Sequence, residues 1–245
     1  MELLCAEGLT KRFGGLTAVD GLSFSVRKGE ILSLIGPNGA GKSTVFNLLS
    51  GVLKPNRGRV VFGGRVITGL KPHRIARLGM GRTFQIMQPF RTMSVLDNVL
   101  TGVLFRQGWK GHLAAARREA LRICDLVGLA DKTDLTAGNL NVAGQKRLEV
   151  ARALAGAPKL LLLDEVMAGL NPAEVAEAMR LVERLRVEKG ITVLLIEHVM
   201  RVVMGISDRV VVIHHGQKIA EGLPREVVAD PRVIDAYLGQ GRGEA

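Results

Sequence analysis

The sequence predicts an α/β fold with a mainly parallel core sheet, an antiparallel β edge subdomain and an inserted α-helical subdomain. Three nearly continuous apolar runs, at residues 31–35, 160–163 and 193–196, are typical of parallel strands that are buried on both faces. Residues 94–155 are rich in Ala, Arg and Leu, with apolar side chains at helical spacing, and predict the helical insertion. Residues 22–26 alternate apolar and polar side chains, as an antiparallel edge strand does.

Two hairpins are expected beside these strands. In the first, residues 60–62 lead through Gly63-Gly64 into the apolar pair at residues 66–67. In the second, residues 214–217 form the turn between two further short strands.

A long helix is expected after the second apolar run. Asn171 supplies an N-cap, and Pro172 suits the first helical position because its missing N–H has no partner to lose there. The helix should continue to about Lys189, since Gly190 is placed to end it.

The length of 245 residues and the hydrophobic fraction of 47% predict a compact soluble protein with a substantial core. We expect one domain over residues 1–245. Residues 1–93 and 156–245 would build the core with its β subdomain, and residues 94–155 the helical subdomain.

Charge, hydropathy and cysteine content narrow the class of protein to which the chain can belong. The formal net charge of +11 invites a nucleic-acid partner, but the basic residues are spread along the chain and only 4% of residues are aromatic, so a solvated or membrane-facing basic surface is favoured. No apolar run approaches the roughly 18 to 20 residues of a membrane span, and Glu2 and Glu7 stand where a signal peptide would be basic. Cys5 and Cys124 are expected to be buried thiols in a reducing cytoplasm.

Residues 36–44 read Gly-Pro-Asn-Gly-Ala-Gly-Lys-Ser-Thr, between an apolar run and a helical-looking stretch at residues 45–49. This matches the phosphate-loop pattern GxxxxGK[ST]. The glycines allow backbone N–H groups to crowd around an anion, and the following helix adds the positive end of its dipole. Lys42 would bring a charge to the β- and γ-phosphates, and Ser43 a hydroxyl to Mg²⁺. The segment predicts a nucleoside triphosphate site.

Two adjacent carboxylates follow the apolar run at residues 160–163. Asp164 and Glu165 would emerge at the carboxyl end of a buried strand, where open α/β sheets bind ligands. Asp164 would hold Mg²⁺, directly or through water, and Glu165 would orient or deprotonate the water that attacks the γ-phosphate.

Two further polar residues have weaker signals. His198 follows the apolar run at residues 193–196 and could bond the γ-phosphate, and Gln85 follows the strand-like pair Thr83-Phe84. Taken alone, a histidine is more often a structural residue, and the glutamine can be an ordinary surface amide.

The order of these motifs resembles the ATPase subunit of an ABC transporter. From residue 3 to residue 239 the chain carries a phosphate loop, a glutamine, a signature segment before an Arg-rich helix, an Asp-Glu pair, a turn and a histidine. Residues 81–85 (Gly-Arg-Thr-Phe-Gln), 163–172 (Leu-Asp-Glu-Val-Met-Ala-Gly-Leu-Asn-Pro) and 230–239 (Asp-Pro-Arg-Val-Ile-Asp-Ala-Tyr-Leu-Gly) resemble the branched-chain amino acid importer branch of that family.

The resemblance implies a role for each matching residue. Phe13 would stack on adenine, Gln85 would reach the metal and the water at the contact with the membrane subunits, and His198 would be the switch histidine. Asp164 would bind the metal and Glu165 would be the catalytic glutamate. The residues expected to hold ATP are Phe13, Gly36, Pro37, Asn38, Gly39, Ala40, Gly41, Lys42, Ser43 and Thr44, and those expected to hold Mg²⁺ are Ser43, Gln85 and Asp164.

Two segments depart from the family pattern. The signature usually reads Leu-Ser-Gly-Gly-Gln, whereas residues 140–144 read Leu-Asn-Val-Ala-Gly, and a register shifted to Gly144-Gln145 would disturb the helix behind it. Asn171 stands where the family usually has an aspartate. Both departures are expected to weaken the site completed on a partner's nucleotide, although Asn141 can still cap the following helix. The signature residues expected to face the partner's ATP are Asn141, Val142, Ala143, Gly144 and Gln145.

The resemblance implies an ATP-hydrolysing subunit that powers an importer of branched-chain or other amino acids or small polar solutes. A second ATPase subunit, a paralogue or another copy, would pair with it head to tail on integral membrane permeases at the cytoplasmic face of the inner membrane. A periplasmic or extracellular solute-binding protein would act indirectly, and no nucleic acid is expected.

Two alternatives stay open at this point. One is a soluble ABC ATPase acting on nucleic acid or ribosomes, which the single cassette and the lack of a heptad run disfavour. The other is a subunit that binds ATP with little hydrolysis, which the atypical signature and Asn171 suggest.

Overall fold

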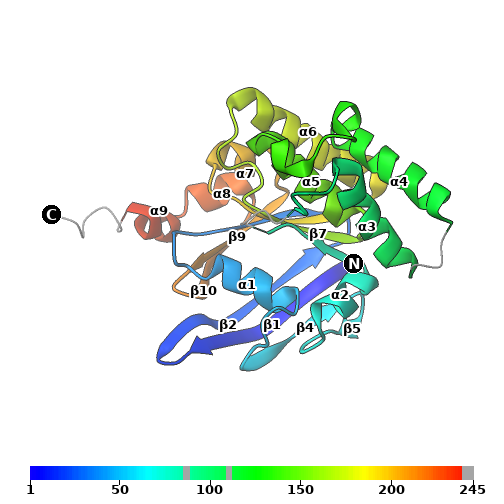
Figure 1. Ribbon diagram of the computed structural model, residues 1–245. Helices are drawn as coiled ribbons and strands as arrows, with labels where there is room; N and C mark the ends of the chain where they lie inside the picture. Colours follow the sequence, from blue (N-terminus) through cyan, green and yellow to red (C-terminus); the bar gives the residue numbers. More distant parts are fainter. Residues whose placement is uncertain (85–88, 109–111, 239–245) are drawn as a thin grey trace. The chain divides into compact units, whose positions relative to one another are not determined.

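The computed structural model describes residues 1–84, 89–108 and 112–238 (Figure 1). Its internal contacts divide the chain into two units. The first unit comprises Met1–Ile75 and Thr192–Ala245, and the second comprises Ala76–Ile191. The chain therefore leaves the first unit after its opening 75 residues and returns to it for the last quarter of the sequence.

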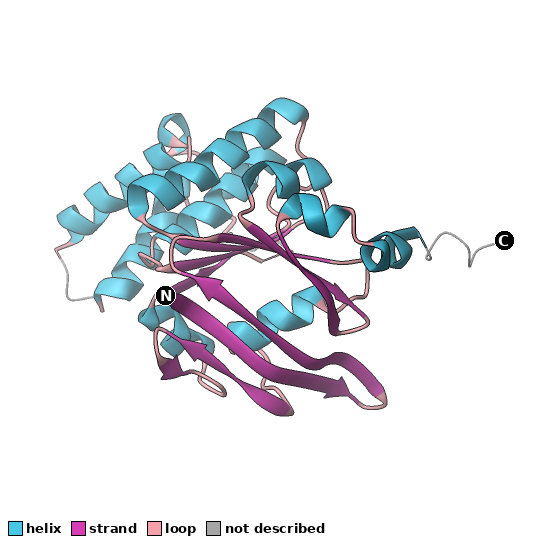
Figure 2. Ribbon diagram, turned by 180° about the vertical axis from the view of Figure 1, so that it is seen from behind, coloured by secondary structure: helices cyan, strands magenta, loops and turns pink. Residues whose placement is uncertain are grey.

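The first unit contains an antiparallel sheet with strand order β2-β1-β4-β5 (magenta in Figure 2). Its strands are β1 (Glu2–Phe13), β2 (Leu16–Arg27), β4 (Arg57–Phe62) and β5 (Arg65–Val66). Leu22, Phe24 and Val26 are buried on one face of β2, which confirms the expected alternation. The hairpin turning at Gly63-Gly64 is also confirmed.

The first unit also contains the parallel strands. β3 (Ile31–Ile35) pairs in parallel with β8 (Thr192–Ile196) on one side and β9 (Arg209–His214) on the other. β10 (Gln217–Gly222) returns antiparallel to β9 and confirms the second predicted hairpin. Every residue of β3 and β8 is buried, as the continuous apolar runs predicted. The helices of this unit are α1 (Lys42–Leu49), α7 (Met200–Ile206), α8 (Pro224–Val228) and α9 (Pro231–Leu238).

The second unit combines a short parallel strand pair with the longer helices. β6 (Met80–Arg82) pairs with β7 (Leu160–Asp164), and α2 (Pro72–Leu78) spans the point in the sequence where the second unit begins. The helices predicted within residues 94–155 are observed, and α3 packs on α4 (green in Figure 1). The remaining elements are α3 (Val95–Gln107), α4 (Leu113–Leu126), the 3-10 turns η1 (Ala130–Lys132) and η2 (Ala137–Asn139), α5 (Val142–Leu154) and α6 (Pro172–Lys189).

The start and end of α6 are confirmed as predicted. Asn171 Oδ1 accepts a hydrogen bond from Glu174 N at 3.0 Å, and Asn171 N donates to Glu174 Oε2 at 2.9 Å, so the two residues form a capping box. Pro172 occupies the first helical turn, and Gly190 ends the helix at φ 64°. Asn171 therefore stabilises the helix start.

The two cysteines differ in environment. Cys124 is buried, but Cys5 is only half-buried, so the expectation of two buried thiols was wrong for Cys5. The reason is that Cys5 alternates along β1 with the buried Leu4 and Ala6, so its side chain points to the other face of the sheet, where its Sγ donates to Glu2 Oε2 at 3.0 Å. Burial raises the pKa of each thiol to about 11, with the Glu2 hydrogen bond adding to the rise at Cys5, so both remain protonated at neutral pH.

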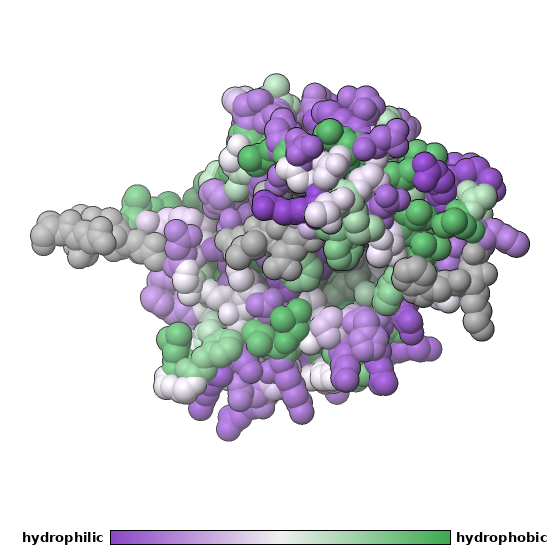
Figure 3. Space-filling model, viewed as in Figure 1, coloured by the Kyte–Doolittle hydropathy of each residue, from purple (hydrophilic) through white to green (hydrophobic). Residues whose placement is uncertain are grey.

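Polar side chains predominate on the face shown in Figure 3, where apolar side chains occur in small groups. Within the described residues, no helix is both long enough and apolar enough to cross a membrane.

The capping box allows a direct stability test. We expect Asn171→Ala to lower the free energy of unfolding by about 1 kcal/mol, because Glu174 N loses its acceptor, whereas Asn171→Asp keeps the cap. Urea unfolding followed by circular dichroism measures the difference. An alanine variant as stable as the aspartate variant would contradict this role.

Candidate nucleotide-binding and catalytic site

The phosphate loop joins a fully buried strand to a helix. β3 ends at Ile35, and α1 begins at Lys42, three residues before the apolar stretch that indicated a helix in the sequence. Gly41 is the N-cap, with φ 103°. Lys42, Ser43 and Thr44 therefore lie in the first turn, where backbone N–H groups have no intrahelical acceptor and the helix dipole is positive.

Two glycines of this loop are required by close backbone approaches. A Cβ at Gly36 would lie 2.1 Å from Ile213 O, and a Cβ at Gly41 would lie 2.4 Å from Ala18 O. Both distances are shorter than any real Cβ contact, and Gly41 also has a left-handed backbone. The loop therefore has its shape only because these positions lack a side chain.

The turn between β9 and β10 also holds the loop. Gly216 N donates to Ala40 O at 3.0 Å, and Asp20 N donates to Gly216 O at 2.9 Å. The hairpin thus links the phosphate loop to β2 through backbone hydrogen bonds, and Gln217 Nε2 adds a side-chain bond to Asp20 Oδ2 of β2 at 2.8 Å. Sequence reasoning identified this hairpin as a turn but gave no signal for its contact with the loop.

The side chain of Lys42 lies against the first two residues of the loop, Gly36 and Pro37. Its Nζ donates to Gly36 O at 2.6 Å and to Pro37 O at 2.8 Å, and the residue is 8% exposed. The ammonium group is therefore held at the same loop whose N–H groups can bind an anion. Ser43, by contrast, is exposed in the first turn of α1, where its hydroxyl is accessible to a ligand.

Phe13 and His198 are exposed in the same unit. Phe13 ends β1, and its ring is 45% exposed with Lys11 Nζ 5.2 Å from the ring centroid. Such an exposed ring offers a face on which an aromatic base can stack. His198 is exposed two residues after β8 and follows the buried Glu197. The predicted roles of both residues stay predictions.

The C-terminal helix contributes a residue that sequence reasoning missed. The backbone of Gly36 donates a hydrogen bond to Tyr237 of α9, and Val233 of α9 belongs to the apolar cluster that contains Ile35. Burial raises the pKa of Tyr237, and the hydrogen bond from Gly36 opposes that rise. The helix therefore supports the end of β3 and the first residue of the phosphate loop. The four-residue spacing of Val233 and Tyr237 was the available signal.

In the second unit, Asp164 is held by a buried ion pair. Arg82 Nη2 lies 3.4 Å from Asp164 Oδ2, and the two side chains are 9% and 2% exposed. Burial lowers the pKa of Arg82, and the neighbouring carboxylate of Asp164 counteracts that effect. Asp164 N also donates to Thr83 Oγ1 at 3.0 Å. Sequence reasoning identified Asp164 but missed its cationic partner.

The strand-like pair Thr83-Phe84 is not part of β6, which ends at Arg82. Thr83 N still donates to Leu162 O at 3.0 Å, but Phe84 N donates to Glu149 Oε2 at 3.1 Å. The carboxylate of α5 thus replaces the next ladder partner, so the strand stops. Gln85, predicted to reach the metal and the attacking water, lies outside the described residues.

Glu165 follows β7 in a left-handed backbone conformation with φ 49°, and it is half-buried. Its carbonyl oxygen accepts hydrogen bonds from Lys146 Nζ at 2.7 Å and from Ala168 N at 3.2 Å. The backbone of the predicted catalytic residue is therefore fixed by a side chain from α5 and by the turn that follows it.

The signature segment begins α5 in a single register. Asn141 is the N-cap and accepts from Gly144 N at 2.9 Å, which confirms that it caps the helix. Asn141 and Val142 are exposed, whereas Ala143 and Gly144 are buried. Gln145 Nε2 donates to Leu140 O at 2.8 Å. The exposed start of the helix is thus Asn141-Val142, and a register shifted to Gly144-Gln145 would place a buried glycine there.

These features define a class of protein. A family model described as ABC transporter matches residues 19–168 of the chain, and one described as branched-chain amino acid ATP-binding cassette transporter matches residues 217–242. The chain belongs to the ABC transporter family, as an ATP-binding cassette. It is an ABC-type ATPase that binds ATP, and the predicted family and fold class are confirmed.

Its relatives are similar over the full chain. The high-affinity branched-chain amino acid transport ATP-binding protein LivG of Salmonella typhimurium is 43% identical, covering 97% of this chain and 98% of the relative. The corresponding protein BraF of Pseudomonas aeruginosa is 41% identical with the same coverage. A crystal structure of an ABC transporter ATP-binding cassette in its ADP conformation matches with a TM-score of 0.88 and 37% identity, over 98% of this chain and 99% of that one.

Lys42 provides a test of the phosphate site. We expect Lys42→Met to weaken ATP binding about 10- to 100-fold, because the charge-assisted bonds lost are worth about 1.5–3 kcal/mol. Calorimetric titration measures the dissociation constant. Lys28→Met, which changes an exposed lysine of the same unit, is the control and should bind ATP as the unmodified protein does. Equal affinity in both variants would refute the assignment.

Proposed function

We propose that this chain hydrolyses ATP to power an importer of branched-chain amino acids or similar small solutes. The observation that carries the proposal is the full-length similarity to branched-chain amino acid transport ATP-binding proteins. A phosphate-loop sequence between a buried strand and the start of a helix supports it. The same relatives do not favour an ATPase that acts on nucleic acid or ribosomes.

In this proposal each predicted residue keeps its chemical role. Residues 36–44 hold the phosphates, with Lys42 as the positive charge, and Phe13 stacks on adenine. Glu165 orients the attacking water or accepts its proton. His198 and Gln85 are proposed to contact the γ-phosphate and the water, respectively.

Mg²⁺ is the proposed metal, because the available donors suit it. Ser43 offers an exposed hydroxyl, and Asp164 offers a carboxylate at the end of β7. Among the described residues, no group of three or more His, Cys, Asp or Glu side chains forms a metal cluster. Mg²⁺ needs no such cluster, because it is usually held by one or two carboxylates together with substrate phosphates. When bound, it would neutralise charge that develops on the phosphates.

A second ATPase subunit is the proposed partner of the exposed helix start at Asn141-Val142. In a head-to-tail pair, this end of α5 would face ATP held by the other subunit, whose phosphates would meet the positive end of the helix dipole. A paralogue as partner would allow the atypical signature to serve only one of the two nucleotides.

Membrane permeases are the proposed partners of a groove in the second unit. The groove has a volume of about 340 Å³, and its lining includes Phe84, which precedes the predicted contact residue Gln85 in the sequence. Phe84 and Phe90 line it and are 50% and 47% exposed. Exposed aromatic side chains at a concave surface are typical of protein interfaces. This contact would place the chain at the cytoplasmic face of the membrane.

The catalytic assignment has a direct test. We expect Glu165→Gln to reduce phosphate release at least about 100-fold, because it removes the general base, while ATP affinity stays unchanged. Phosphate release and calorimetric titration would be measured on the same preparation. Hydrolysis at the original rate in the glutamine variant would refute the assignment of Glu165 as the general base.

The partner assignment is tested by purifying the tagged chain from its own cells in mild detergent. We expect permeases and a second ATPase subunit to copurify, and the double variant Phe84→Ala/Phe90→Ala to lose the permeases because it empties the aromatic groove. Val187→Ala, which truncates an exposed apolar residue of α6, is the control. Retention of the permeases by the double variant would contradict the docking surface.

A further inference from the structure

Lys146 links two functional segments of the second unit. It lies on α5, five residues after the N-cap Asn141, and its Nζ donates to the carbonyl oxygen of Glu165 at 2.7 Å. At 1.5 Å per residue, five helical residues correspond to about 7.5 Å along the axis. One short stretch of helix therefore connects the exposed start of the signature helix to the backbone of the predicted catalytic glutamate.

The backbone of Glu165 needs such a restraint. Its φ of 49° is a left-handed conformation that residues with a side chain rarely adopt, and it persists only where neighbouring groups hold it. The bonds from Lys146 Nζ and Ala168 N to the Glu165 carbonyl supply that restraint. Rotation about this φ would change the direction of the Glu165 carboxylate. The hydrogen bond from Lys146 therefore helps to fix the orientation of the carboxylate.

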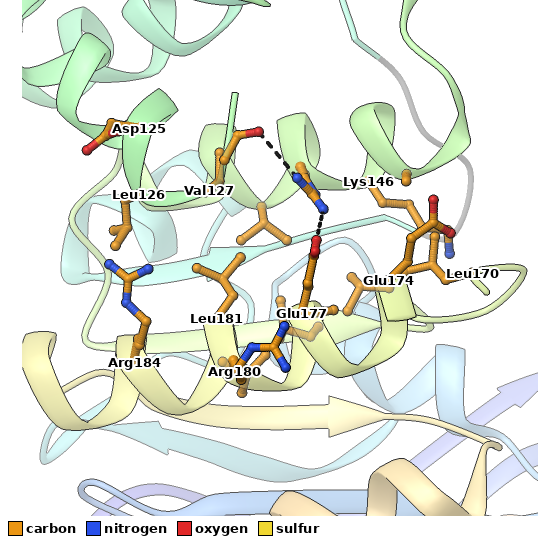
Figure 4. A pocket seen from close by; sticks show the side chains of 18 residues that line it. Asp125, Leu126, Val127, Lys146, Leu170, Glu174, Glu177, Arg180, Leu181 and Arg184 are labelled. Atoms are coloured by element: carbon orange, nitrogen blue, oxygen red, sulfur yellow. Dashed lines mark hydrogen bonds and ion pairs between the residues drawn. The ribbon is translucent and has the colours of Figure 1, made fainter. Parts of the chain in front are cut away.

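A second interaction, formed by Arg147, holds α5 beside α6. Arg147 Nη2 forms an ion pair with Glu177 Oε2 of α6, and Arg147 Nη1 donates to Gly128 O at 3.3 Å. Figure 4 shows these bonds at a pocket of about 420 Å³, whose lining also includes Lys146 and Arg180. Lys146 and Arg147 therefore project from one helix to three anchors, which are Glu165 O, Glu177 Oε2 and Gly128 O, and a shift of α5 changes these contacts together.

We propose that Lys146 is a positioning residue that couples the start of α5 to the orientation of Glu165 in the same chain. The inference rests on the proposed function, in which Asn141-Val142 faces the partner's ATP and Glu165 acts on the ATP of its own chain. Engagement of the helix start by the partner's nucleotide moves α5, and Lys146 transmits the movement to the Glu165 backbone. Because coupling between binding sites is reciprocal, each nucleotide then influences binding of the other.

The test uses three variants in the complex purified with its permeases and second ATPase subunit. Lys146→Met keeps the length and apolar stem of the side chain but removes the donor. Lys146→Arg retains a cationic donor and serves as the rescue. Arg180→Met removes an exposed cation that lines the same pocket on α6 and serves as the matched control.

We expect Lys146→Met to lower kcat about 10- to 100-fold while KM for ATP stays unchanged, because a misplaced catalytic group costs rate and the phosphate loop is untouched. Lys146→Arg should recover most of the lost rate, and Arg180→Met should match the unmodified complex. The Hill coefficient for ATP should exceed 1 in the unmodified complex and fall toward 1 in Lys146→Met.

Several outcomes would overturn the inference. These are an unchanged kcat in Lys146→Met, a rise in KM together with a lower melting temperature, which would indicate a purely structural residue, and a Hill coefficient of 1 in the unmodified complex. Glu165→Gln, measured in the same assay, separates this inference from the proposed function. If Glu165→Gln is inactive and Lys146→Met is fully active, only the role of Lys146 fails. If Glu165→Gln is active, the catalytic assignment itself fails.

Discussion

The geometry of the phosphate loop depends on backbone groups that approach more closely than a Cβ permits. The carbonyls of Ile213 and Ala18 lie against Gly36 and Gly41, and Gly216 bonds the loop at Ala40. The loop is therefore held from outside by β2 and by the turn between β9 and β10. This support explains why the predicted anion site needs strands from both ends of the sequence.

In the second unit, side chains hold the predicted site residues in place, whereas in the first unit backbone groups hold the phosphate loop. Asp164 is held by Arg82 and Thr83, and the strained Glu165 by Lys146. A buried ion pair such as Arg82–Asp164 contributes little net stability, but removal of one partner leaves an uncompensated buried charge. The arrangement therefore fixes the position of the carboxylate more than it stabilises the fold. Precise placement is what the role proposed for Asp164 in phosphoryl transfer would require.

Local features of the site followed from the sequence because each depends on a few neighbouring residues. The phosphate loop, the Asp164-Glu165 pair, the Asn141 cap and the Asn171-Pro172 helix start are all encoded within short segments. One local pattern was misleading, because a residue far away in the sequence changes the structure there. The pair Thr83-Phe84 resembles a strand in the sequence, because no nearby residue indicates that Glu149 of α5 accepts the hydrogen bond of the Phe84 N–H.

The sequence by itself determined the fold class, because periodicity and caps act over one or two turns of chain. Its ordered motifs also indicated the family by resemblance, and their residue types predicted a phosphate site. Only the tertiary structure decided the partners of those residues. Arg82 with Asp164, Lys146 with the Glu165 carbonyl and Tyr237 with Gly36 are 82, 19 and 201 residues apart in the chain, respectively. Such pairs form only when separate elements pack together, so no local pattern could specify them.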